Sequence, residues 1–125
     1  MRKEEFKART KVFALRVLKL AEALPETRSG RILGNQIGRS ATSVAANYRA
    51  ACRARSKAEF IAKLGIVEEE ADETQLWLEM IGEAGLISSH RLAPLLEEAD
   101  QIVAMVVSSI NTTRVNAKTR PGPSR

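Results

Sequence analysis

Apolar residues recur along this chain at spacings of three and four, which is the period of an amphipathic α-helix. Clusters rich in Pro, Gly and Ser interrupt the pattern, and no stretch alternates between polar residues and β-branched or aromatic ones as a strand would. The pattern therefore predicts an all-α protein with four helices, at about 5–24, 31–53, 57–82 and 89–113.

The third predicted helix has the clearest start and the most regular apolar face. Ser56 and Glu59 match a capping box, in which two side chains satisfy free backbone N–H groups at a helix start. From Phe60 to Ile81 the core positions alternate between spacings of four and three, as in left-handed bundle packing. Because the connections are short, we expect an antiparallel up-down-up-down four-helix bundle over residues 1–113.

The third and fourth predicted helices carry more apolar residues than one core requires. Large exposed apolar patches are uncommon on monomers, so the surplus predicts self-association. The alternative is that Trp77 and its neighbours simply widen the core of a single bundle. The residues predicted for an interface between copies are Ile66, Trp77, Met80, Leu95, Ile102 and Met105.

Length and composition fit one soluble domain. The 125 residues are 44% hydrophobic and 28% charged, which is enough chain to bury a core without disulfides or metals. Cys52 is the single cysteine, so it excludes an intrachain disulfide. Because no apolar run is long enough for a signal peptide or a membrane span, we expect a cytoplasmic protein with no membrane association.

The net charge of +5 conceals a strong asymmetry along the chain. Residues 1–63 hold 15 Lys and Arg against five Asp and Glu, whereas residues 64–113 hold one basic residue against ten acidic ones. Residues 114–125 add four basic residues and no acid, which predicts a basic, flexible C-terminal tail.

No group of residues indicates enzymatic chemistry. A di-iron site in a four-helix bundle needs two Glu-x-x-His pairs, and His90 is the single histidine. Consecutive acids in the run 68–73 point in different directions around a helix and cannot converge on a metal. We therefore expect no catalytic residues, no metal and no cofactor.

The better functional candidate is a basic cluster around the turn between the second and third predicted helices. Arg and Lys side chains there can neutralise nucleic-acid phosphates. The alternative is that they pair with the acidic run 68–73, which would leave a protein-interaction scaffold with no nucleic-acid role. The residues predicted to bind nucleic acid are Arg39, Arg49, Arg53, Arg55 and Lys57.

A series of short motifs resembles the bacterial four-helix-bundle family associated with 23S ribosomal RNA intervening sequences. They are QIGRSA at 36–41, SVAAN at 43–47, RSKAEF at 55–60, ETQL at 73–76 and GLI at 85–87. The resemblance implies an up-down four-helix bundle that assembles as a ring-like homopentamer. Family function is poorly defined, but a similar protein serves as a nucleic-acid-binding accessory to a retroelement reverse transcriptase. The leading hypothesis is thus a non-enzymatic oligomeric module that binds structured RNA or DNA.

Overall fold

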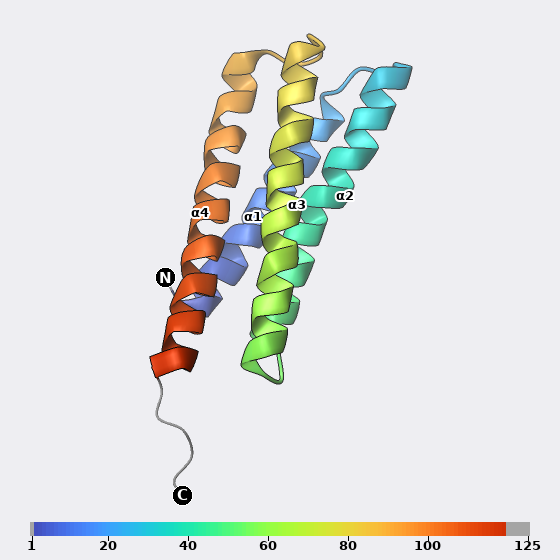
Figure 1. Cartoon of the computed structure of the whole chain (residues 1–125). Helices are drawn as coiled ribbons and strands as arrows, with labels where there is room; N and C mark the ends of the chain where they lie inside the picture. Colours follow the sequence, from blue (N-terminus) through green and yellow to red (C-terminus); the bar gives the residue numbers. More distant parts are fainter. Residues whose placement is uncertain (1, 120–125) are drawn as a thin grey trace, which may run out of the picture.

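The part of the chain that the structure describes folds into four α-helices that run alternately up and down (Figure 1). This computed structural model describes residues 2–119, in which the helices are α1 (Lys3–Glu22), α2 (Arg28–Cys52), α3 (Lys57–Glu83) and α4 (Ser89–Thr119). No strand occurs within residues 2–119. The predicted all-α four-helix bundle is confirmed, and the α2–α3 turn lies at the end opposite to the other two turns (Figure 1).

Several helix ends differ from the sequence prediction. α1 stops at Glu22 because the next two residues close the helix with i→i−3 bonds before Pro25, which disfavours helical geometry in the residue before it. α2 begins at Arg28, earlier than predicted, because Thr27 Oγ1 accepts a hydrogen bond from a backbone N–H of its first turn at 3.0 Å. α4 continues to Thr119, so residues 114–119 are helical where a tail was predicted. Residues 120–125 of that predicted tail lie outside the described part of the chain.

A glycine ends α3 as the sequence predicts. Gly85 has a φ of 73°, in the left-handed region that L side chains rarely adopt. The Leu86 N–H donates a hydrogen bond to the Ile81 carbonyl at 3.0 Å, which is the 6→1 hydrogen bond of a Schellman motif. This geometry turns the chain back on itself and sets α4 antiparallel to α3.

The core is mostly aliphatic, with Phe6, Phe13 and Tyr48 as its aromatic members, and it receives side chains from every helix. The α3 face predicted from the sequence is buried at each position from Leu64 to Ile81, and Phe60 is half-buried at its start. Three polar side chains are buried in the described part of the chain: Thr10 donates to the Lys7 carbonyl at 3.0 Å, and Ser40 Oγ and Thr74 Oγ1 lie 2.8 Å apart between α2 and α3. The largest fully buried side chains include Phe13, Ile37, Leu64, Leu78, Ile81, Leu92 and Ile102.

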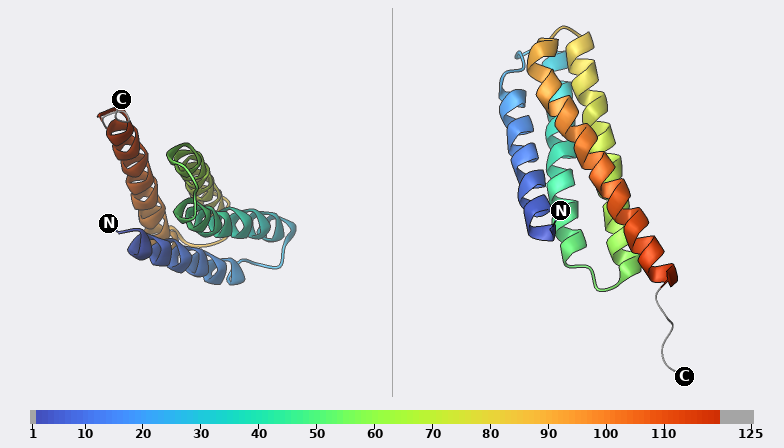
Figure 2. Two further views of the ribbon diagram at one scale, coloured as in Figure 1. Left: turned by 90° about the horizontal axis from the view of Figure 1, so that it is seen from below. Right: turned by 90° about the vertical axis from the view of Figure 1, so that its left-hand side faces the viewer.

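α1 and α4 are the neighbouring helices that pack least closely. With 20 and 31 residues, they span about 30 and 46 Å at the usual rise per residue. Figure 2 shows α4 crossing away from α1 toward the end where the chain terminates. Arg9 joins the two helices by a bidentate ion pair with Glu98, in which Nε–Oε2 is 2.7 Å and Nη2–Oε1 is 2.8 Å. Beyond this pair the bundle opens between the start of α1 and the last turns of α4.

Candidate nucleic-acid interface

Four basic residues surround the turn between α2 and α3. Arg49 lies in the last turn of α2, Arg53 caps that helix, Arg55 follows in the turn and Lys57 opens α3. All four side chains are exposed, and none forms an ion pair with another residue in the described part of the chain. We call these four residues the turn cluster; their positive charge is available to an external anion.

Local hydrogen bonds fix the backbone of this turn. Ser56 Oγ accepts from the Glu59 N–H at 3.0 Å, as the capping box predicts. The Glu59 carboxylate accepts from the Arg55 N–H at 3.2 Å, one residue before the usual partner. The Glu59 carboxylate thereby holds backbone rather than side chains and leaves the turn cluster without an acidic partner.

Arg39 does not belong with the turn cluster. It lies in mid-α2, roughly 20 Å along the helix from Arg53 at the usual rise per residue. Its guanidinium forms ion pairs with Glu70, at 2.9 Å, and with Glu73, both on α3. Within the chain, the predicted alternative of pairing with the acidic run is thus realised for Arg39 and not for the turn cluster. Its assignment as a nucleic-acid contact stays a prediction, and it differs from the turn cluster in having acidic partners within the chain.

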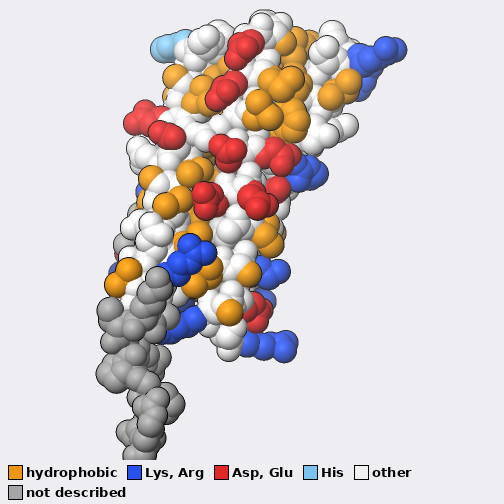
Figure 3. All heavy atoms as spheres, viewed as in Figure 1, with side chains coloured by type: hydrophobic (Ala, Val, Ile, Leu, Met, Phe, Trp, Pro, Cys, Tyr) orange, Lys and Arg blue, Asp and Glu red, His pale blue; other side chains and the backbone are white. Residues whose placement is uncertain are grey.

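Charge is unevenly distributed on one face of the molecule. On the face drawn in Figure 3, acidic side chains cover the middle and upper parts, over α3 and α4, while Lys and Arg side chains predominate toward the lower end. The lower end is the one that carries the α2–α3 turn (Figure 1). An extended polyanion would therefore meet repulsion over most of this face and attraction at one end.

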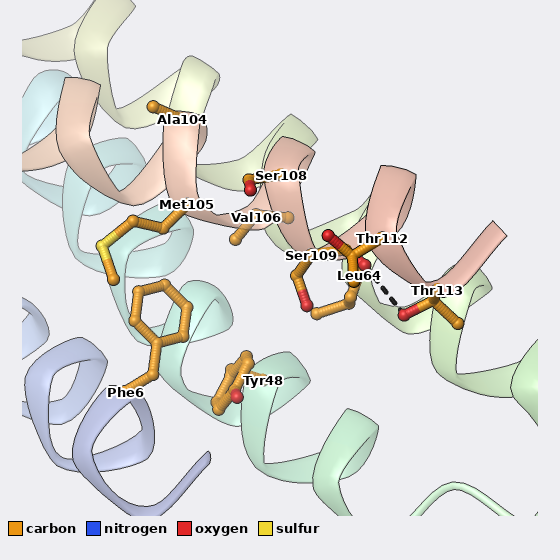
Figure 4. Close-up of a pocket in the computed structure, with 10 residues that line it drawn as sticks. All are labelled: Phe6, Tyr48, Leu64, Ala104, Met105, Val106, Ser108, Ser109, Thr112 and Thr113. Carbon is orange, nitrogen blue, oxygen red and sulfur yellow. Dashed lines mark hydrogen bonds between the residues drawn. The ribbon is translucent and has the colours of Figure 1, made fainter. Parts of the chain in front are cut away.

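A groove adjoins the turn cluster where α1 and α4 diverge. It consists of two cavities of about 450 and 510 Å³, which have Tyr48, Ser109 and Thr113 in common. Figure 4 shows the first of them, with Phe6 and Tyr48 from α1 and α2 facing the inner side of α4. We call the two cavities together the open-end groove. Sequence patterns do not predict it, because it depends on the relative lengths and tilt of two helices distant in sequence.

Tyr48 is the titratable group of the groove that the fold perturbs most clearly. Burial raises the pKa of its phenol, and the proximity of Cys52, one turn further along α2, raises it further. The ring packs edge to face on Phe6 with 4.6 Å between centroids. Tyr48 therefore stays a neutral hydroxyl at physiological pH, able to donate a hydrogen bond but not to serve as a base.

Two of the residues predicted for an interface between copies are buried within the chain itself. Leu95 is 4% exposed and Ile102 is fully buried, so their assignment to an exposed stripe is corrected. Trp77 and Met105 are half-buried, and Met105 faces the open-end groove. Ile66 is about one-third exposed, and Met80 keeps 43% of its area accessible on the outer side of α3.

A second apolar surface, on α1, escaped the sequence reasoning. Val12, Leu15 and Leu18 are 53%, 58% and 39% exposed; Val12 and Leu15 lie on the outer side of α1, and Leu18 lies at its border with α2. The signal was present as apolar residues three apart, but the stronger core periodicity of the same helix masked it. Lys11 and Lys19 are exposed on the same helix, so its outer side is both apolar and basic.

Other chemistry has little support in the described residues. No group of three or more His, Cys, Asp and Glu side chains there could share a metal ion. His90 is exposed in the first turn of α4. None of the helices in residues 2–119 is long and apolar enough to cross a lipid bilayer.

The fold and the site define a small up-down four-helix bundle with unpaired cations gathered at one end. The chain belongs to the family described as 23S rRNA-intervening sequence protein, whose model matches residues 2–108. A similar solved structure is the crystal structure of a protein of unknown function from the S23 ribosomal protein family of Bacteroides thetaiotaomicron VPI-5482. It is 32% identical, has a TM-score of 0.83, and the match covers 89% of this chain and 99% of that one. The chain has no significant similarity to a curated protein.

Proposed function

We propose that this protein is a non-enzymatic module that binds structured RNA or DNA and works as an assembly of several copies. The observation that carries the nucleic-acid part is the turn cluster, four exposed cations without an ion pair in the described residues. Lys3 adds a fifth positive charge at the same end, where it lies over the Phe60 ring. The family description names a 23S rRNA intervening sequence, which makes RNA the first ligand to test.

Binding of this kind should depend strongly on salt. Each phosphate that an Arg or Lys neutralises releases condensed counterions, so the logarithm of affinity falls linearly with the logarithm of salt concentration. Four or five contacts predict a slope of about −3 to −5, depending on whether the nucleic acid is single- or double-stranded. Base specificity is not implied by these contacts, because phosphates carry no sequence information.

Charge reversal at the turn tests the nucleic-acid part. Arg53→Glu with Arg55→Glu should abolish the binding of an RNA hairpin, followed by fluorescence anisotropy over a range of salt concentrations. The matched control is Arg28→Glu with Arg31→Glu, which makes the same change in net charge at the opposite end of α2 and should leave most of the affinity. Equal losses in the two variants would show a non-specific charge effect. No binding by the unaltered protein at low salt would sink the nucleic-acid part and favour the scaffold alternative.

Two complementary faces support the assembly part. The outer side of α1 is apolar and basic, whereas the outer side of α3 combines Leu76 and Met80 with exposed acids such as Asp72 and Glu79. The backbones of α1 and α3 do not approach each other closely, and the two helices lie diagonally across the bundle (Figure 2), so their outer sides face away from each other. A face that binds a different face of the next copy gives a head-to-tail contact, which closes into a ring when the rotation permits. The proposed assembly is such a ring, with five copies as the family resemblance implies.

Complementation of two damaged faces tests this arrangement. Leu15→Glu should spoil the α1 face and Met80→Lys the α3 face, so each variant alone should be monomeric by light scattering. Mixed together, the two variants should form a one-to-one dimer, because each retains the face that the other lacks. A contact in which each face binds its own counterpart would give no such rescue, and variants that remain oligomeric would refute these faces as the interface.

A further inference from the structure

The open-end groove has the size of a ligand site and a graded lining. Its two cavities, of about 450 and 510 Å³, fall within the range of about 300–1,000 Å³ usual for small-molecule sites. The inner part is apolar and aromatic, with Phe6, Leu64 and Val106. The outer part reaches Lys3, Arg55 and Lys57 at the turn.

Hydroxyl groups lie between these two parts of the groove. Ser109 and Thr113, one turn apart on α4, line both cavities, while Ser108 and Thr112 line the inner one. The hydroxyls of Ser108, Ser109 and Thr112 have no hydrogen-bond partner among residues 2–116. Thr113 Oγ1 donates to the Ser109 carbonyl at 2.8 Å and keeps its lone pairs available (Figure 4). A ligand with several hydrogen-bonding groups would satisfy these hydroxyls, whereas an acyl chain would leave them unpaired.

An aromatic ring marks the outer half of the groove. Phe60 is half-buried at the start of α3, and Lys3 Nζ lies 4.8 Å from its ring centroid. One side of this ring is thus covered by the ammonium of an exposed lysine rather than by packed protein. A flat base that displaces the Lys3 ammonium would stack on this face, since base–aromatic stacking requires only an accessible ring face. Lys3 could then pair with a phosphate of the same nucleotide.

We infer that the open-end groove takes an unpaired nucleotide of the strand that the turn cluster binds. The base enters among Phe60, Tyr48 and the α4 hydroxyls, and its phosphates lie against Lys3, Arg55 and Lys57. This inference rests on the proposed nucleic-acid binding and adds a preference to it. The protein should bind a strand with an unpaired segment more tightly than a fully paired one, because a base within a duplex cannot reach the groove.

The preference can be measured with two RNA hairpins that share one stem, one blunt and one with a short unpaired extension, and with their DNA counterparts. The full-length protein should bind the extended hairpin about tenfold more tightly, as expected for one stacked base. Ser109→Leu fills the groove, and Phe60→Leu removes the aromatic ring but keeps most of its apolar bulk. Both variants should lose the preference for the extended hairpin while still binding the blunt one. Ser29→Leu adds the same bulk at the other end of the bundle and should change nothing.

The outcomes separate this inference from the proposed function. Equal affinity of the unaltered protein for both hairpins, or a preference that survives in Ser109→Leu, overturns the groove as a nucleotide site and leaves the turn cluster standing. No binding of either hairpin overturns both. Thermal unfolding of each variant identifies any that fails to fold, and Phe60→Leu then provides a test independent of Ser109→Leu. Comparing the RNA and DNA pairs shows whether the groove requires a ribose.

Discussion

The ion pair between Arg9 and Glu98 should make a measurable, pH-dependent contribution to stability. It is bidentate and partly buried, with side-chain exposures of 25% and 16%, and it joins the two helices that pack least closely. The hydrogen bonds from Arg9, more than its charge alone, lower the pKa of Glu98, although burial acts in the opposite direction. Replacing Glu98 by Gln removes the negative charge and leaves one acceptor oxygen for the two N–H donors of Arg9.

We expect Glu98→Gln to reduce the free energy of unfolding by about 2 kcal/mol at neutral pH, which is the range for one charge-assisted hydrogen bond. For a domain of this size, that loss lowers Tm by about 5–10 °C. Glu97→Gln, at the exposed neighbouring position, is the matched control and should change stability by no more than about 0.5 kcal/mol.

The pH dependence of this stability difference provides a more specific test. Because the folded pKa of Glu98 lies below its unfolded value of about 4.3, the stabilisation is complete above that pH and is lost as pH falls through the folded pKa. Urea unfolding across this window should show the deficit of Glu98→Gln shrinking as pH falls, while the protein becomes less stable overall. A deficit that is the same at neutral pH and at about pH 3, or no deficit at neutral pH, would refute this account.

Further predictions concern the core and the backbone. Thr74→Val should reduce the free energy of unfolding by about 1 kcal/mol, because the Ser40 hydroxyl keeps only its longer hydrogen bond to the Ile37 carbonyl. Adding Ser40→Ala should recover much of that loss, as measured by urea unfolding. Gly85→Ala should destabilise by about 1–2 kcal/mol because its φ is positive. Gly65→Ala, in mid-α3 with open space around the position, should instead stabilise by about 1 kcal/mol; the same sign in both glycine variants would contradict the backbone argument.

The fold could be predicted from sequence because helical period and breakers are local signals, but the core face of α4 could not. From Leu92 onward, apolar residues occur in adjacent pairs, such as 95 with 96 and 102 with 103, so two heptad faces fit equally well. Leu95 and Ile102 were predicted to lie in an interface between copies, whereas the structure buries them in the core, more deeply than Leu96 and Val103. The tilt of α4 across the bundle decides between the faces, and tilt is a property of packing.

The candidate site shows the same division between local and long-range information. The turn cluster lies around one connection, so its residues were brought together by sequence proximity alone. The pairing of Arg39 with Glu70 and Glu73 depends instead on the axial alignment of α2 against α3, between residues more than thirty positions apart. No local pattern sets that alignment. For the same reason the open-end groove, built from α1, α2, α3 and α4, could not be anticipated.

The loose packing of α1 against α4 also bears on how the chain folds. Nearly all contacts between helices in the described residues join helices that follow one another in sequence. Folding can therefore proceed by forming successive helical hairpins, each of which closes only a short loop. Such a topology favours rapid folding, with the α1–α4 pairing free to form last. In native-state hydrogen exchange, the amides of α1 and of the final turns of α4 should open below the global unfolding free energy, and those of α2 and α3 should exchange last.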